Sequence, residues 1–286
     1  MMVRPLFLII DIIFHHIFLF LKDLQLFYKE FLRFSGFLSD MKKMILKGIE
    51  ALAEFIFPRI CLICGSRLIS AEKHLCMRCL IDMPQTYFWN RSHNPMADRF
   101  NEMIEKNNHE AEHYAYACAL FFYYSEAEYR KIPYQLKYQS NMKIGTYFGK
   151  MLGCRLSASL LWKDVDMVIP VPLHRSRLWK RGYNQAEVIA AAIAVSLGVQ
   201  MNNEILIRNR RTKTQTKVDV QKKGSNVSGA FTARKYSSDI HIRHILLVDD
   251  VFTTGSTLMA CFTALRSVFP PSVRISVATL GFVGGA

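Results

Sequence analysis

The sequence feature that most constrains the fold is a short apolar run that ends in two adjacent aspartates and leads into a hydroxyl-rich loop. Residues 245–248 read ILLV, which is typical of a buried strand in a parallel sheet. Asp249 and Asp250 follow at its carboxyl end, the edge where open α/β sheets place their ligand sites. Beyond the loop, apolar residues recur at helical spacing from Leu258 to Leu265. This order of strand, loop and helix favours an α/β fold.

The loop has the composition of a phosphate site. Its five residues are Thr253, Thr254, Gly255, Ser256 and Thr257. Backbone N–H groups and small hydroxyls can converge there at the amino end of the following helix, where the helix dipole favours an anion. The adjacent aspartates repel each other, and the vicinal hydroxyls of a ribose would give both carboxylates hydrogen-bond donors. We therefore predict a ribose 5-phosphate site, against the alternative of a helix cap with a turn.

The segment LLVDDVFTTGST resembles the phosphoribosyl-diphosphate signature of type I phosphoribosyltransferases. It is not a Walker A loop, because the required Gly-Lys-Thr/Ser is missing. The resemblance implies that Asp249, Asp250 and residues 253–257 bind phosphoribosyl diphosphate. Mg²⁺ would accompany this ligand, held mainly by pyrophosphate and ribose oxygens, since the ion prefers substrate phosphates and water.

Cations gather in two further segments, and the whole chain is basic. With 37 Lys and Arg against 23 Asp and Glu, the formal charge of +14 favours an anionic partner over a surface kept only for solubility. The segment PVPLHRSRLWKRGYNQA follows a predicted strand, and arginine suits bidentate phosphate contacts. The second segment is the basic stretch at residues 208–223. We predict that both segments face a pyrophosphate or DNA, the alternative being a solvated surface. The predicted contact residues are Arg175, Arg177, Lys180, Arg181, Arg210, Arg211 and Lys213.

Four of the seven cysteines form a metal-binding pattern. Cys61, Cys64, Cys76 and Cys79 have the spacing C-x2-C-x11-C-x2-C, which predicts a closed structural Zn²⁺ site; a redox dithiol pair is the alternative. His74 could replace one sulfur, although its spacing fits less well. The isolated cysteines, Cys118, Cys154 and Cys261, are predicted to be small core residues.

The amino-terminal residues are unlike the rest of the chain. Residues 6–21 are almost entirely apolar, yet the run is slightly short for a bilayer, which needs about 20 residues, and it contains Asp11, His15 and His16. We interpret residues 1–40 as an apolar extension from a misplaced start, the alternative being a weak membrane-associated segment. Residues 41–57 have the spacing of a helix that Pro58 ends. We assign residues 58–90 to a zinc ribbon and residues 110–286 to the phosphoribosyltransferase-like domain.

Several motifs in the same order resemble the ComF/GntX family. They are the PVPLHRSRLWKRGYNQA segment, IPYQLKY at residues 132–138, residues 211–215, residues 226–231 and the four cysteines of the family's double zinc ribbon. The resemblance covers roughly residues 45–283. It implies a type I phosphoribosyltransferase-like, mainly parallel sheet with a small amino-terminal zinc lobe. Predicted strands at residues 115–124, 165–171, 199–207, 245–248 and 273–283 agree with an α/β order.

The resemblance also implies a role in natural transformation, in which the protein handles incoming single-stranded DNA. Trp179, Tyr183 and Phe231 could then stack with bases. The alternative is an active phosphoribosyltransferase with an unknown acceptor. Implied partners are phosphoribosyl diphosphate, single-stranded DNA, a DNA-uptake helicase and recombination-loading proteins. The expected location is the cytoplasm, at the inner face of the membrane if membrane association is peripheral.

Overall fold

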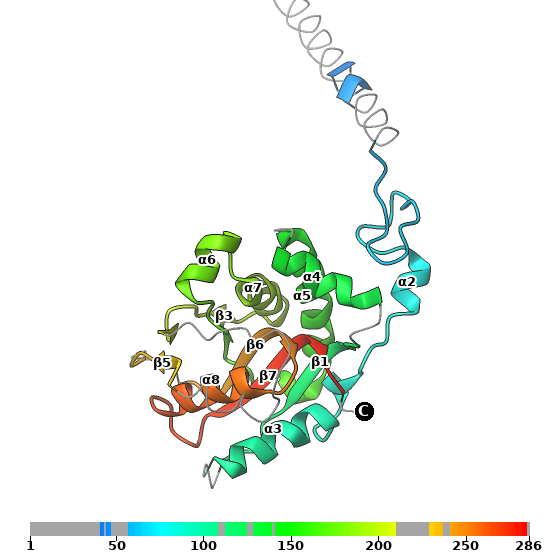
Figure 1. Ribbon diagram of the computed structural model, residues 1–286. Coiled ribbons are helices and arrows are strands. Elements are labelled where there is room, and N and C mark those ends of the chain that lie inside the picture. The colour runs from blue at the N-terminus through cyan, green and yellow to red at the C-terminus, as the bar shows by residue number, and fades with distance from the viewer. Residues whose placement is uncertain are drawn as a thin grey trace, which may run out of the picture. The chain divides into compact units, whose positions relative to one another are not determined.

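The computed structural model describes residues 41–42, 44–46, 57–107, 112–124, 128–138, 141–209, 229–236 and 241–284 (Figure 1). The chain divides into two compact units, Met1–Ile60 and Cys61–Ala286. In the first unit, residues 41–42 and 44–46 are helical, within the helix predicted over residues 41–57. The extension predicted over residues 1–40 lies outside the described residues.

The second unit is built on a five-stranded parallel sheet. The strands lie in the order β1 (Ala117–Phe122), β7 (Arg274–Phe282), β6 (His244–Phe252), β2 (Met167–Pro170) and β3 (Gln200–Met201). Every neighbouring pair in this sheet is parallel. The central strands are buried for most of their length, as both faces of a parallel sheet are in α/β proteins. The predicted α/β fold with a mainly parallel sheet is confirmed.

Helices cover both faces of this sheet (Figure 1). On one face lie α5 (Met142–Ala158) and α7 (Gln185–Leu197), and on the other lie α3 (Pro95–Lys106) and α8 (Ser256–Arg266). The two helices α5 and α7 approach closely because α5 presents glycines to α7. A Cβ on Gly149 would stand only 2.9 Å from the carbonyl oxygen of Ile189.

Shorter elements connect these layers. They are α2 (Met77–Ile81), α4 (Lys131–Tyr138), α6 (Arg175–Arg181), the 3-10 turns η1 (Phe88–Asn90), η2 (Glu128–Arg130) and η3 (Leu160–Trp162), and the antiparallel pair β4 (Leu206–Arg208) and β5 (Phe231–Ala233). The strand predicted over residues 199–207 is therefore wrong in one respect, since it is split between two sheets. The break lies at Asn202, whose Oδ1 accepts the backbone N–H groups of Glu204 and Ile205, each at 3.0 Å.

The cations at residues 175–181 lie in a short helix, α6, because the His174 Nδ1 atom caps the Ser176 N–H at 3.2 Å and Gly182 ends the helix with a φ of 78°. One further expectation needs correction. Cys118 and Cys261 are buried as predicted, whereas Cys154 is exposed on α5. The helical spacing of its apolar neighbours does not extend to Cys154 itself.

Candidate functional site

The two aspartates lie on the central strand, near the carboxyl edge of the sheet. Strand β6 continues through them to Phe252, four residues beyond the predicted end at Val248. Asp250 is buried and Asp249 is half-buried. The backbone N–H of Asp250 donates to Asp249 Oδ1 at 2.8 Å, which fixes the orientation of that carboxylate. The carboxyl ends of β2 and β7 lie on either side of this pair.

The electrostatic state of the pair depends on two cations, Lys137 and Arg208, that the sequence motifs did not assign to the site. Burial, and then the charge of Asp250, raise the pKa of Asp249 to about 7, while Lys137 and Arg208 oppose that rise. Lys137 comes from α4 and holds its Nζ 2.9 Å from Asp250 Oδ2. Arg208 comes from β4, where its guanidinium lies 5.0 Å from the centre of the Phe231 ring. The motif IPYQLKY already contained Lys137; no pattern distinguished Arg208 from the other cations of its stretch.

The predicted phosphate loop follows β6 and turns sharply into α8. Gly255 has a φ of 80° and occupies the capping position of the helix, so no side chain caps the first turn. The hydroxyls of Thr254 and Ser256 lie 3.0 Å apart. Thr253 is exposed, and Thr254, Ser256 and Thr257 are half-buried. The first-turn N–H groups and these hydroxyls form an edge that suits a phosphate group.

The close surroundings of Gly255 add a second constraint on this residue. A Cβ there would lie 2.7 Å from Phe252 Cζ and 2.9 Å from Met103 Sδ. Glycine is therefore required by packing as well as by its backbone angle.

Helix α6 contributes cations to the same region. Burial lowers the pKa of Arg208, and the neighbouring charge of Arg177 lowers it further. Arg181 acts in the same way on Lys137, whose pKa nevertheless stays above its ordinary value because of Asp250. Arg175 and Lys180 are exposed. Arg210, Arg211 and Lys213 lie outside the described residues.

Taken together, the described residues bring cations from three elements to a pair of carboxylates beside a loop of N–H and hydroxyl donors. Cations and donors suit phosphates, and the carboxylates suit hydroxyl groups. A ligand with both, such as a sugar phosphate, matches this edge of the sheet.

The four cysteines predicted as metal ligands do lie together. Their sulfur atoms are all within 4.8 Å of one another, and those of Cys64 and Cys76 are 3.7 Å apart. Sulfurs bound at 2.3 Å around a tetrahedral Zn²⁺ stand about 3.8 Å apart, so the donor set fits this ion. Two backbone N–H groups also point at the sulfurs, from Cys76 to Cys61 Sγ at 3.4 Å and from Cys79 to Cys76 Sγ at 3.5 Å. Gly65, with a φ of 74°, makes the first tight turn.

The cysteine cluster is tied to the segment that also carries Lys137. The Tyr129 hydroxyl donates to the carbonyl of Cys79 at 2.7 Å, and Lys131 Nζ donates to the carbonyl of Ile63 at 2.8 Å. His74 does not belong to the cluster; its ring packs against Tyr147 at 5.1 Å. The cluster could hold a structural metal such as zinc, which would stabilise a lobe with little core of its own.

Comparison with known proteins agrees with the motifs. No family model matches the chain. Competence protein F of Haemophilus influenzae is 34% identical over 110 residues, which are 38% of this chain and 48% of that protein. DNA utilization protein YhgH of Escherichia coli O157:H7 is 36% identical over 93 residues, which are 32% of this chain and 40% of that protein. The resemblance to the ComF family is confirmed. The protein of the same name from Salmonella typhimurium is 30% identical over 132 residues, 44% of this ComF-like chain and 56% of the relative.

The ComF-like chain thus spans about half the length of the curated relatives that it matches. Among the residues that the structure describes, no helix combines the length and the apolar character needed to cross a bilayer.

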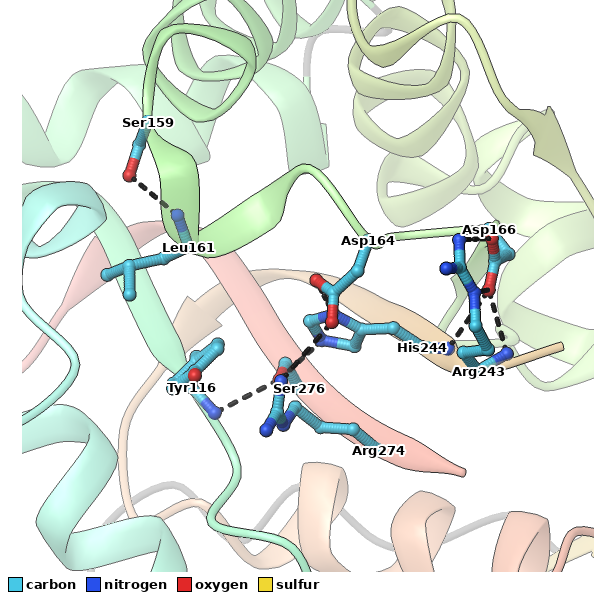
Figure 2. A network of polar contacts seen from close by, with 9 residues as sticks. All are labelled: Tyr116, Ser159, Leu161, Asp164, Asp166, Arg243, His244, Arg274 and Ser276. Carbon is cyan, nitrogen blue, oxygen red and sulfur yellow. Dashed lines mark hydrogen bonds and ion pairs between the residues drawn. The ribbon is translucent and has the colours of Figure 1, made fainter. Parts of the chain in front are cut away.

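A second polar constellation lies at the opposite, amino-terminal edge of the sheet (Figure 2). His244 Nε2 is 2.7 Å from Ser276 Oγ, and its Nδ1 is 2.8 Å from Asp164 Oδ1. This is the order of groups found in serine hydrolases. His244 and Ser276 are fully buried, however, and Ser276 Oγ also accepts the backbone N–H of Tyr116 at 3.0 Å. We interpret the network as a structural link between the amino ends of β1, β6 and β7.

Proposed function

We propose that this ComF-like chain binds phosphoribosyl diphosphate at the carboxyl edge of its sheet and acts in DNA uptake by handling incoming single-stranded DNA. The observation that carries the first part is the position of Asp249 and Asp250, near the carboxyl end of a central parallel strand and shortly before the loop that Gly255 turns into α8. The names of the relatives, a competence protein and DNA utilization proteins, support the second part. A DNA-uptake helicase and recombination-loading proteins stay predicted partners.

In this proposal each group of residues has a separate task. Residues 253–257 donate N–H and hydroxyl hydrogens to the 5-phosphate, and the two aspartates accept from the ribose hydroxyls. The diphosphate faces Lys137, Arg177 and Arg208. Binding requires Lys137 to move from Asp250 toward the phosphates, since the same carboxylate oxygen serves the ribose. Mg²⁺ would neutralise the diphosphate together with these cations.

Calorimetric titration with phosphoribosyl diphosphate and Mg²⁺ tests the site. Asp249→Ala combined with Asp250→Ala should abolish binding while the protein stays folded, because the ribose loses its acceptors. Asp82→Ala is the matched control, since Asp82 is an exposed carboxylate of the cysteine lobe that pairs only loosely with Arg78 at 3.7 Å. Unchanged affinity in the folded double variant would exclude this site.

The position of Asp249 supports catalysis as a second candidate function. It lies near the carboxyl end of β6 with its carboxylate oriented by the backbone N–H of Asp250, and burial together with the charge of Asp250 raises its pKa to about 7, in the range that suits a group exchanging protons at neutral pH. In a phosphoribosyl transfer, an acceptor nucleophile forms a bond to ribose C1, pyrophosphate leaves with the bonding electrons, and the acceptor's proton passes to a base. Release of pyrophosphate only in the presence of a nucleobase or another acceptor distinguishes transfer from simple binding. Absence of release across a panel of acceptors leaves the binding function.

A further inference from the structure

Trp179 on helix α6 is almost completely exposed. The chain has three tryptophans; Trp179 is 91% exposed, whereas Trp89 and Trp162 are 3% and 1% exposed. Helix α6 has the sequence RSRLWKR, so its cations surround the indole and no acidic residue belongs to the helix. A large aromatic ring left in water among cations fits an anionic partner that offers flat apolar faces.

The neighbouring helix α4 presents two more aromatic rings. Tyr134 and Tyr138 are 54% and 66% exposed, and their ring centres lie 4.9 Å apart, one helical turn along α4. Helix α4, with the sequence KIPYQLKY, also has no acidic residue. The Arg181 guanidinium lies 5.7 Å from the centre of the Tyr138 ring, so the two helices meet at this pair. We call Tyr134, Tyr138, Trp179, Lys180 and Arg181 the α4–α6 surface.

We propose that the α4–α6 surface binds single-stranded DNA, with unpaired bases stacked on its aromatic rings and phosphates against its cations. This inference rests on the proposed role in DNA handling and gives that role a location. Stacking requires base faces that a duplex does not expose, and basic grooves with aromatic rings are the usual means of holding single strands. Both helices add positive charge to this surface and neither contributes a carboxylate, which favours an anionic partner over a neutral protein face.

The α4–α6 surface borders the proposed ribose-phosphate site. Lys137, between the outward-facing tyrosines in the sequence of α4, turns inward to Asp250. A single strand on α4 and a ligand at Asp250 would therefore contact adjacent faces of one helix.

This location differs from the one that sequence reasoning suggested. Phe231 is only 5% exposed and its ring is covered by Arg208, so it cannot stack with a base and that prediction is wrong. Tyr183 is half-buried, and its hydroxyl donates to the carbonyl of Leu136. Of the three predicted rings, Trp179 is the exposed one, and the tyrosines of α4 take the place of the other two.

Tryptophan fluorescence tests the inference directly, because a soluble quencher such as acrylamide reaches Trp179 and not the two buried indoles. An oligothymidylate of 20 nucleotides should protect the quencher-accessible emission of the wild-type protein. In a parallel anisotropy titration of the labelled oligomer, Trp179→Ala and Tyr138→Ala should each weaken binding by roughly five- to 150-fold, the loss of one stacked base. Trp179→Phe should keep most of the affinity, because a phenyl ring still stacks.

The chain offers matched control variants for the aromatic rings and for the positive charges of the α4–α6 surface. Tyr124→Ala removes a tyrosine that is 51% exposed at the end of β1, and it should leave affinity unchanged. Arg181→Gln should lower the salt dependence of binding, by about 0.7 log units per log unit of salt for one phosphate contact. Arg243→Gln, at the amino end of β6 on the other edge of the sheet, should leave the salt dependence of binding unchanged.

The outcomes separate this inference from the proposed function. If the protein binds single strands tightly, none of the α4–α6 variants weakens this binding and Trp179 is not protected, the α4–α6 surface is not the binding site. The proposed role in DNA handling would then still stand. No binding by the wild-type protein at low salt would overturn both. Equal affinity for a duplex of the same length, or tighter binding of oligouridylate, would overturn the commitment to single-stranded DNA. Circular dichroism and thermal denaturation verify that each variant is folded.

Discussion

Lys137 on helix α4 holds its Nζ 2.9 Å from Asp250 Oδ2 on strand β6, and both side chains are largely shielded from water, at 29% and 13% exposed. The ion pair connects a helix that contacts the cysteine lobe to the strand that carries the candidate ligand site. It also lowers the repulsion that two adjacent carboxylates would otherwise have.

The first prediction concerns the strength of this pair. Lys137→Ala should lower the free energy of unfolding by about 1–3 kcal/mol, less than for a fully buried pair because solvent screens part of the interaction. In a double-mutant cycle with Asp250→Asn, the two losses should sum to more than the loss in the double variant. Arg78→Ala, which breaks an exposed pair in the cysteine lobe, should change stability by less than about 1 kcal/mol. Additive losses at Lys137 and Asp250 would contradict the coupling.

The second prediction concerns the pH dependence of stability that Asp249 produces. Its pKa is raised to about 7 in the folded protein, from 3.8, so the folded state binds more protons between these values than the unfolded chain does. Asp249 therefore contributes stability that is present below about pH 4 and is lost as pH rises through 7. Asp249→Asn should remove that loss and make the ligand-free protein more stable than wild type at pH 8. Urea denaturation at pH 5 and pH 8 gives the free energy of unfolding of both proteins at each pH. If this free energy changes equally between the two pH values in wild type and variant, the pKa of Asp249 is not raised and the prediction is wrong.

The fold was predictable because its signals are local. The apolar run before Asp249, the loop at Gly255 and the helix after it follow from period and composition, and they place a parallel strand at the centre of the sheet. The cysteine spacing likewise predicted which four sulfurs meet. These patterns need no knowledge of the rest of the chain.

The rest of the site depends on tertiary contacts that no local pattern carries. Lys137 and Arg208 reach the aspartates from segments far away in sequence, and an isolated Lys or Arg looks the same whether it faces water or a carboxylate. The burial of Phe231 beneath Arg208 also depends on tertiary contacts that the local sequence does not indicate. Sequence alone ends β6 too early because aspartates are poor strand formers, whereas in the structure pairing with β7 continues past Val248, from Asp249 opposite Thr279 to Phe252 opposite Phe282.

The third prediction is that the cysteine cluster holds zinc. Metal analysis of the purified protein should find about one Zn per chain, as a site of four thiolates requires. Cys64→Ser and Cys79→Ser should each reduce the metal content and lower the melting temperature of the lobe. Cys154→Ser is the matched control, because Cys154 is an exposed cysteine outside the cluster. Full zinc content in both cluster variants would rule the site out.

The fourth prediction separates two roles of Gly255. Gly255 and Gly182 both have a positive φ, at 80° and 78°, but a Cβ meets no atom within 4 Å at Gly182 and meets Phe252 and Met103 at Gly255. Gly182→Ala should cost about 1 kcal/mol of stability from backbone strain alone. Gly255→Ala should cost more, about 2–4 kcal/mol, because overpacking adds to that strain. Similar losses in thermal denaturation would mean that Phe252 and Met103 move aside easily.

The last prediction concerns the buried histidine of the structural network. Burial lowers the pKa of His244, although Asp164 partly opposes this, so the folded protein binds fewer protons than the unfolded chain below pH 6.5. His244 therefore lowers the free energy of unfolding as pH falls from 6.5, and His244→Gln should flatten that part of the plot of stability against pH.

The same burial predicts that the network is chemically inert. A fluorophosphonate probe, which labels serine nucleophiles of hydrolases, should not react with Ser276, because both Ser276 and His244 are inaccessible. Labelling that Ser276→Ala abolishes would show that the network opens to solvent and would give it a chemical role instead of a structural one.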